Sequence, residues 1–446
     1  MSSLFETLPE QPAPAPAKPG GARRLRTANR GQLILTPGSL DDMLPQDHQA
    51  RAVVAFVARL DLSPLRDAIR SREGTPGHPA IDPAILIALW LYATIDAAGS
   101  ARELERLCEL SLPYQWICGG VGVNHHTLAD ARLDCDAWLD ATLTASLAAL
   151  LDAGAISLDT VAQDGLRVRA SAGAGSFRRR PTLERFRAGA RERVAALKRE
   201  LNGDAGASHR RKDAARARAA RERVERIEAV LAAMPEAEQR AARNKKKPGQ
   251  ARVSATDVDA SVMRMPDGGF RPAYNTQLAA ETEHGLIVGL EVSTSGGGQP
   301  SLEPMVAQVE KRCCRRVPNW LADGGFFNRA VATRLAKAGL TLFCPPHKAP
   351  AGKRRPGEAM ESDTPEVAAL RERMAGEEGQ ARYRTRARWI EWVNAGYRAR
   401  GWHQVPVRGV AKVRTLVRWQ ALTHDMTRIL RTAALNTAFP RRLRLA

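Results

Sequence analysis

The chain has 446 residues, 44% hydrophobic and 26% charged, which is the composition of a globular protein able to bury at least two cores. Lys and Arg number 68 against 48 Asp and Glu, giving a net charge of +20. Such a surplus indicates a polyanionic partner, with nucleic acid favoured over an anionic membrane surface. The longest uncharged apolar run, residues 84–95, is too short to cross a bilayer. We therefore expect no membrane span and no signal peptide.

Two classes of enzyme are disfavoured by the motifs that the sequence lacks. The six cysteines show no Cys-x-x-Cys spacing and the nine histidines no His-Glu-x-x-His pattern, which argues against a zinc site. Gly-x-Ser-x-Gly is also absent, which argues against a serine hydrolase.

The amino-terminal third divides into an arm and a helical region. Residues 1–38 are rich in Pro, Ala and Gly and contain several arginines, which predicts a disordered basic arm. Residues 39–154 have a helical pattern, in which Asp82-Pro83, Ser100-x-x-Glu103 and Thr127-x-x-Asp130 predict helix starts. Short helices joined by glycine turns fit a helix-turn-helix-like domain for DNA binding or dimerisation. A purely structural helical cap is the alternative.

Two acids follow strand-like runs. The run 156–168 predicts a strand containing Asp164, and the run 317–322 predicts a buried strand that delivers Asp323 at its tip. Asp159 lies five residues before Asp164 and therefore points to the opposite face of a regular strand. Asp164-Gly165 repeats the Asp323-Gly324 pattern. A carboxylate at a strand end suits a metal or a phosphate ester, although Asp323 also fits a cap for the following helix.

A basic insertion occupies residues 178–250. It holds 22 Lys and Arg against 10 Asp and Glu, so +12 of the chain's +20 lies here. Apolar residues at spacings of three and four predict a hairpin of two amphipathic helices with a narrow coiled-coil seam. We expect the hairpin, with Lys245, Lys246 and Lys247 as a basic tail, to lie along phosphate. The alternative is a solvated charged surface.

The remaining runs predict an α/β catalytic domain made of residues 155–177 and 251–435. Strands over 273–280 and 286–292, joined by a turn at 283–285, follow the Asp164 strand as a meander. A helix over 302–309 then crosses over to the Asp323 strand. A helix over 330–338, with Asn328 as its predicted cap, leads to a strand at 340–343. This order predicts a ribonuclease H-like mixed sheet flanked by helices. We expect residues 348–380 to be mobile, residues 382–435 to be largely helical and residues 436–446 to form a basic tail.

A third carboxylate is needed for a pair of hard cations, and the carboxy-terminal helix offers Glu391. It lies within an apolar stripe and is surrounded by arginines. The alternative is a surface ion pair of Glu391 with Arg384 or Arg388.

These residues carry a resemblance to a known family. Asp164-Gly165, Leu321-Ala322-Asp323-Gly324-Gly325-Phe326, and Tyr383-x-x-Arg386 followed by Glu391 and Arg398 resemble the DDE transposases of bacterial insertion sequences. More narrowly, they resemble the branch with a Tyr-Arg-Glu-Lys signature and a helical amino-terminal domain. The likeness extends over nearly everything from residue 40 onward.

The resemblance implies a set of roles. Asp164, Asp323 and Glu391 would bind two divalent metals, Mg²⁺ or Mn²⁺, while Tyr383, Arg386 and Arg398 would contact phosphates of the transposon end. Three departures from the family pattern stand out: Arg398 in place of Lys, Gly298 where many relatives have an acidic or amide residue, and Asp425 in place of Asn.

The activity that the resemblance implies is metal-dependent cleavage and strand transfer at terminal inverted repeats. Its partners would be double-stranded DNA, as transposon ends and target, and a second copy in a homodimer on DNA. We expect a cytoplasmic protein that is nucleoid-associated when bound to DNA. A catalytically inactive DNA-binding regulator and a ribonuclease H-like nuclease are the alternatives.

Overall fold

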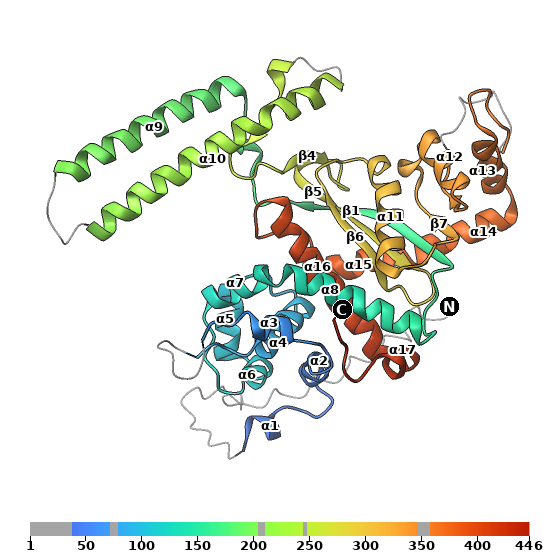
Figure 1. Cartoon of the computed structure of the whole chain (residues 1–446), viewed down its shortest axis with the longest axis horizontal. Coiled ribbons are helices and arrows are strands. Elements are labelled where there is room, and N and C mark those ends of the chain that lie inside the picture. Colours follow the sequence, from blue (N-terminus) through green and yellow to red (C-terminus); the bar gives the residue numbers. More distant parts are fainter. Residues whose placement is uncertain (1–37, 72–78, 204–209, 244–247, 347–356, 446) are drawn as a thin grey trace, which may run out of the picture. The chain divides into compact units, whose positions relative to one another are not determined.

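The computed structural model describes residues 38–71, 79–203, 210–243, 248–346 and 357–445. Their main feature is a mixed sheet in which the strands lie in the order β4-β5-β1-β7-β8, with β6 also paired to β5 (Figure 1). The strand bounds are Thr160–Arg169 for β1, Ser261–Arg264 for β4, Phe270–Glu281 for β5, Ile287–Ser293 for β6, Asn319–Leu321 for β7 and Thr341–Phe343 for β8. A separate two-stranded ladder joins β2 (Phe177–Arg178) to β3 (Val253–Ser254).

The strand pairing has the predicted order. β1, β5 and β6 form an antiparallel meander, whereas β7 pairs parallel to both β1 and β8. Helix α11 (Leu302–Cys313) connects β6 to β7, and α12 (Arg329–Lys337) connects β7 to β8. The predicted meander, crossover and two further strands are thus confirmed, and the sheet is compatible with a ribonuclease H-like fold. The β4 strand at the edge was not predicted.

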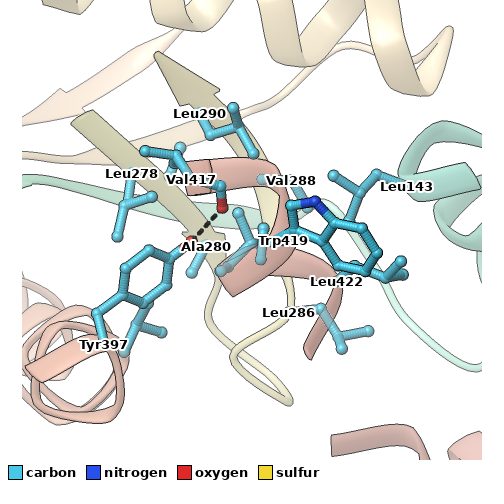
Figure 2. Packing of buried hydrophobic residues seen from close by; sticks show 14 of the residues in the cluster. Leu143, Leu278, Ala280, Leu286, Val288, Leu290, Tyr397, Val417, Trp419 and Leu422 are labelled. Atoms are coloured by element: carbon cyan, nitrogen blue, oxygen red, sulfur yellow. Dashed lines mark hydrogen bonds between the residues drawn. The ribbon is translucent and has the colours of Figure 1, made fainter. Parts of the chain in front are cut away.

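Helices cover both faces of this sheet. A Cβ on Gly289 of β6 would lie 2.7 Å from both Met305 and Val309, so α11 packs closely on that face. The next residue, Leu290, points to the opposite face because side chains alternate along a strand. There it packs with α16 (Val410–Arg431), whose Val417, Trp419 and Leu422 are buried against the sheet (Figure 2).

The amino-terminal helices pack onto this same α16. They are α1 (Leu40–Met43), α2 (Gln49–Val57), α3 (Ser63–Asp67), α4 (Pro83–Ile95), α5 (Ala101–Leu110), α6 (Leu112–Cys118), α7 (His125–Asp134) and α8 (Asp136–Asp152). The Trp419 indole donates to the Arg132 carbonyl at 2.9 Å, and Arg418 forms an ion pair with Asp136 at 2.5 Å. One apolar cluster therefore runs from these helices into the sheet.

The helix starts test the capping predictions. Asp82 accepts a hydrogen bond from the Ala84 amide and Asn328 accepts one from the Val331 amide, so both predicted caps are confirmed. Helix α5 begins directly after Ser100, so the predicted start is confirmed, but the Ser100 side chain makes no capping hydrogen bond. The Thr127 start is wrong: Asn124 caps α7 three residues earlier by accepting from the Thr127 amide at 2.9 Å.

Other boundaries also differ from expectation. Within the stretch 348–380, α13 (Pro365–Ala375) packs against α12 and buries Val367 and Leu370, which contradicts a mobile segment there. The carboxy-terminal region is helical as expected, and continues through α17 (Ala433–Ala438) to the buried side chains of Phe439 and Leu443. No described helix combines the length and apolar character that a membrane span requires.

The hairpin of the insertion consists of α9 (Arg180–Gly203) and α10 (Arg210–Arg243), which pack against each other. Its predicted seam is largely buried, with Leu183, Leu197, Ile227 and Met234 each at most 6% exposed. Phe186 is the exception, at 39% exposed. The basic tail Lys245–Lys247 and the arm 1–37 lie outside the described residues.

Asp425 is a fully buried acid in α16. Its carboxylate accepts a hydrogen bond from the Ile287 amide at 3.0 Å. Burial raises the Asp425 pKa well above its ordinary value, and the nearby Glu281 carboxylate adds to the shift. The folded state therefore holds this proton more tightly than the unfolded chain does. The contribution to stability is largest at low pH and declines as pH rises toward the folded pKa.

We accordingly expect Asp425→Asn to stabilise the protein. The amide oxygen keeps the bond from Ile287 without a charge that can be desolvated, so the gain over the parent chain grows as pH rises from about 4 toward neutrality. Thermal melts across this range check it. A gain that is independent of pH would show that Asp425 does not titrate differently in the folded state.

Candidate active site

Asp164 lies on β1, and Asp323 lies two residues beyond the end of β7, the neighbouring parallel strand. Ala162 of β1 pairs with Leu321 of β7, and each acid follows its paired residue by two positions. Because side chains alternate along strands, both carboxylates leave the same face near the same end of the sheet. Such strand ends are where ligands bind in open α/β sheets.

Asp323 begins a short helical turn, η4 (Gly324–Phe326). Its Oδ1 accepts from the Gly325 amide at 2.8 Å, so the predicted capping role is also present. Beneath it, the buried Cys344 thiol donates to the Asp323 carbonyl at 3.0 Å. Burial and the Asp323 carboxylate raise the pKa of Cys344 to about 12, which keeps that thiol protonated.

Asp164 is the buried member of the set, with its side chain 21% exposed. Oδ1 accepts from the Gly165 amide at 2.8 Å and Oδ2 from the Asn394 side chain at 3.0 Å. Burial raises the Asp164 pKa, as do the Asp323 and Glu391 carboxylates, while the Gly165 hydrogen bond and the Arg386 charge oppose the rise. Three carboxylates thus share one electrostatic environment, in which a cation favours the ionised state.

Glu391 reaches this environment through an irregular helix. A π-helical segment, η5 (Ala387–Glu391), separates α14 (Glu377–Arg386) from α15 (Trp392–Ala399). In an α-helix, residues five apart point about 140° away from each other, whereas a π-turn brings i and i+5 together. Arg386 Nη2 accordingly lies 3.9 Å from Glu391 Oε1.

Arg386 bridges two of the three acids. Its side chain is 13% exposed, and Nη1 lies 3.7 Å from Asp164 Oδ2. Among the described residues, Nη1 has no hydrogen-bond partner. The guanidinium also lies 5.7 Å from the ring centroid of Tyr383. Arg386 is therefore a built-in counter-charge between Asp164 and Glu391, in place of the surface pairs with Arg384 or Arg388 considered from sequence.

Two tryptophans fix the helix that carries Glu391. Gly285, in the β5–β6 turn, has φ +76°, and a Cβ there would lie 2.8 Å from the Trp389 ring and 3.4 Å from that of Trp392. Ile390 is fully buried on the same helix. The turn and the helix therefore touch with no space for a side chain, and the contact sets where Glu391 projects.

The turn itself is held by a buried carboxylate and a buried imidazole. Both Glu281 oxygens accept backbone amides, including those of His284 and Leu286. His424 Nε2 lies 2.9 Å from the Gly285 carbonyl, and burial together with the Arg400 charge lowers the His424 pKa to about 3. The imidazole is thus neutral and donates to that carbonyl.

Glu281, Glu283 and His284 also bring three potential ligand atoms within 4.8 Å of one another. Because the Glu281 oxygens are already occupied by amides, this group acts as a brace for the turn rather than as a metal centre.

The other predicted site residues have varied surroundings. Tyr383 is half-buried, and burial raises its pKa. Arg398 is half-buried and forms no side-chain hydrogen bond or ion pair with any described residue. Asp159 pairs with Arg382 at 3.4 Å, away from the three acids. A Cβ on Gly298 would meet the Phe326 ring at 3.0 Å, and the adjacent Gln299 donates to the Phe327 carbonyl.

Sequence reasoning missed Asn394, whose side chain donates a hydrogen bond to Asp164. The signal was available, since Asn394 follows Glu391 by three residues and therefore lies on the same helical face. Sequence reasoning missed the π-helical segment η5 as well.

The donor set fits hard divalent cations. Carboxylate oxygens suit Mg²⁺ and Mn²⁺, and Asp164, Asp323 and Glu391 supply them from three separate elements. In the described residues their oxygens do not all lie within 4.8 Å of one another. Glu391 is 61% exposed and pairs with Arg386. Binding of cations to all three acids therefore requires the Glu391 side chain to move inward and the guanidinium to give way.

Comparisons with known families agree with this geometry. The family described as a transposase domain matches residues 38–133, and the family described as a transposase DDE domain matches residues 252–433. Together the two matches indicate a DDE-type transposase family, whose members are DNA-acting enzymes. The second match includes Asp323 and Glu391 and begins after the strand that carries Asp164. No curated protein and no solved structure matches the chain.

Replacing Gly285 by alanine tests the contact that positions Glu391. The left-handed backbone alone costs about 1–2 kcal/mol, and the clash with Trp389 adds about 1–3 kcal/mol. Gly339→Ala is the matched control, because its φ is +89° with no atom within 4 Å of the added Cβ. Urea unfolding of both variants gives the comparison. Equal losses of unfolding free energy in the two variants would mean that the close contact of Gly285 with Trp389 does not contribute to stability.

Arg386→Gln tests the built-in counter-charge. We expect the metal-free variant to lose about 1–3 kcal/mol, because Asp164 and Glu391 keep their charges without the guanidinium. Mn²⁺ should then raise its melting temperature more than that of the parent, since no internal cation competes. Arg384→Gln, at an exposed position on the same helix, is the control. Identical Mn²⁺ shifts in all three chains would exclude competition at Arg386.

Proposed function

We propose that the chain is a DNA transposase that binds the terminal inverted repeats of its own insertion sequence and performs metal-dependent strand cleavage and strand transfer. One observation carries the proposal. Asp164 lies on β1 and Asp323 two residues beyond the end of the adjacent parallel strand β7, and Glu391 is tied to Asp164 through one buried guanidinium. The match to a transposase DDE domain supports it.

Asp164, Asp323 and Glu391 would hold two ions, Mg²⁺ or Mn²⁺. When bound, such ions activate the attacking hydroxyl and stabilise the charge of an in-line phosphoryl transfer. Asp164 is held in place by the Gly165 amide and Asn394, so its free electron pairs have fixed directions. Asp323 keeps Oδ2 available while Oδ1 accepts from Gly325. Glu391 would close the site by moving inward.

Arg386 would serve twice in this scheme. In the resting chain it neutralises Asp164 and Glu391. Once cations take over that task, the guanidinium becomes available to a phosphate of the transposon end, for which its fork geometry is suited. Tyr383 packs beside it, and Arg398 follows Glu391 by seven residues, about two helical turns, which directs it to the same face. These three side chains are our proposed phosphate contacts.

Double-stranded DNA is the proposed partner, both as transposon ends and as target. The amino-terminal helices and the basic insertion, including Lys245, Lys246 and Lys247, would bind the transposon ends with a steep dependence on salt. A homodimer that holds two ends together would permit strand transfer. The proposed location is the cytoplasm, in association with the nucleoid when DNA is bound.

A catalytically inactive DNA-binding regulator is the second candidate. The observation that favours it is the exposure of Glu391, at 61%, together with the separation of the three carboxylates. Such a protein would bind the same DNA without any dependence on divalent cations and would make no nicks.

Asp323→Ala distinguishes the candidates. A transposase loses Mg²⁺-dependent cleavage of a duplex carrying the element's terminal repeat, because one of three ligands is gone, while its affinity for that duplex is retained. Denaturing gels measure cleavage and mobility shifts measure binding. Glu361→Gln, at an exposed acid that is not among the proposed ligands, is the control and should cut like the parent. Cutting by the Asp323→Ala chain would refute the assigned site, and products without strand transfer would indicate a nuclease.

A further inference from the structure

The helical hairpin has little apolar surface left for a protein partner. Helices α9 and α10 run side by side (Figure 1), and the apolar side chains between them are buried. Among the described residues of the hairpin, Phe186 is the one large hydrophobic side chain that is exposed. Protein interfaces need a larger apolar centre than this.

The two helices instead form a groove of about 800 Å³. Its lining includes small residues such as Gly189 and Ala219, which leave room between the helices, and also the exposed Phe186. Its walls carry five arginines and a single acid: Arg185, Arg193, Arg216, Arg223, Arg226 and Glu222. A concave surface lined by charge of one sign concentrates the opposite charge.

Three of these arginines have no acidic partner. Arg185, Arg223 and Arg226 are exposed and form no ion pair with any residue that the structure describes. Two acids elsewhere on the hairpin already have a basic partner: Glu228 pairs with Arg191 at 2.6 Å and Glu238 with Arg180 at 3.0 Å. The groove therefore keeps its positive charge available for an external anion.

The spacing of the arginines fits a polymer of phosphates. At about 1.5 Å per residue, Arg185 and Arg193 span about 12 Å of α9, and Arg216 to Arg226 span about 15 Å of α10. Duplex DNA carries about one charge per 1.7 Å of its axis, so several phosphates fall within this length. Each guanidinium group can donate two parallel hydrogen bonds to two oxygens of one phosphate.

We propose that the groove between α9 and α10 binds the sugar-phosphate backbone of duplex DNA without regard to its sequence. Contacts to the sugar-phosphate backbone carry no sequence information, so a groove that binds the backbone would hold any duplex. The contact would increase the affinity of the chain for any duplex DNA, including the target. It rests on the proposed function, in which DNA is the substrate.

Two double variants of the full chain test the proposal. Arg185→Gln with Arg223→Gln removes two unpaired charges from the groove. Arg191→Gln with Arg221→Gln removes two charges from a separate hollow of about 180 Å³ on the same hairpin and so matches the net charge. The probe is a duplex of random sequence, titrated by fluorescence anisotropy at several salt concentrations. Circular dichroism melts check that both variants fold.

Loss of two phosphate contacts should weaken binding on the order of thirtyfold at 0.15 M salt and reduce the log–log salt slope by about 2. The control pair should change much less. Equal losses in both variants would overturn the proposal, since net charge alone would then explain them. Unchanged DNA binding with an altered sedimentation coefficient would also overturn it and assign the groove to a second copy. If the parent chain binds the random duplex but never cuts terminal repeats, the proposed transposase activity is refuted, while the proposal that the groove binds DNA is still supported.

Discussion

The arrangement of the site depends on one buried positive charge. Arg386 lies between Asp164 and Glu391, and without it the carboxylates converging from two strands and a helix would repel one another in a partly desolvated space. The other features of the site serve this geometry. Parallel pairing of β1 and β7 aligns the two aspartates, and the π-turn places Glu391 beside Arg386. The chain thus holds Glu391 beside Asp164 through Arg386, and cation binding would still require Glu391 to move inward.

The support for this arrangement lies on the far side of the helix that carries Glu391. Trp389 and Trp392 rest on Gly285, and the turn that contains Gly285 is held by Glu281 and by the neutral His424. Buried polar groups in such a network are costly unless each is satisfied, so the network specifies one geometry of the turn. The position of Glu391 thereby depends on residues that lie outside the proposed ligand set.

Sequence patterns predicted most of the sheet because alternating and apolar runs with glycine turns are local signals. They also located Asp82 and Asn328 as caps. They wrongly predicted a capping hydrogen bond at Ser100 and a helix start at Thr127, because capping depends on the geometry of the preceding loop. In the structure Asn124 is the cap, and it accepts a hydrogen bond from the Thr127 amide. The π-helical segment η5 could not be predicted from the sequence, because the apolar residues around it have the spacing of an ordinary amphipathic helix. These residues are Trp389, Ile390, Trp392 and Val393. Nothing local in the sequence reveals that Arg386 and Glu391 share a face.

Helix α16 packs against two regions of the chain, the amino-terminal helices and the sheet. Its Trp419 donates to Arg132 and packs beside Leu143 of α8, while Val417 accepts from Tyr397 of the helix that follows Glu391 (Figure 2). A fragment that began at residue 155 would leave the indole of Trp419 in water. The amino-terminal helices consequently shield α16 from water, and α16 in turn contacts Tyr397, six residues after Glu391.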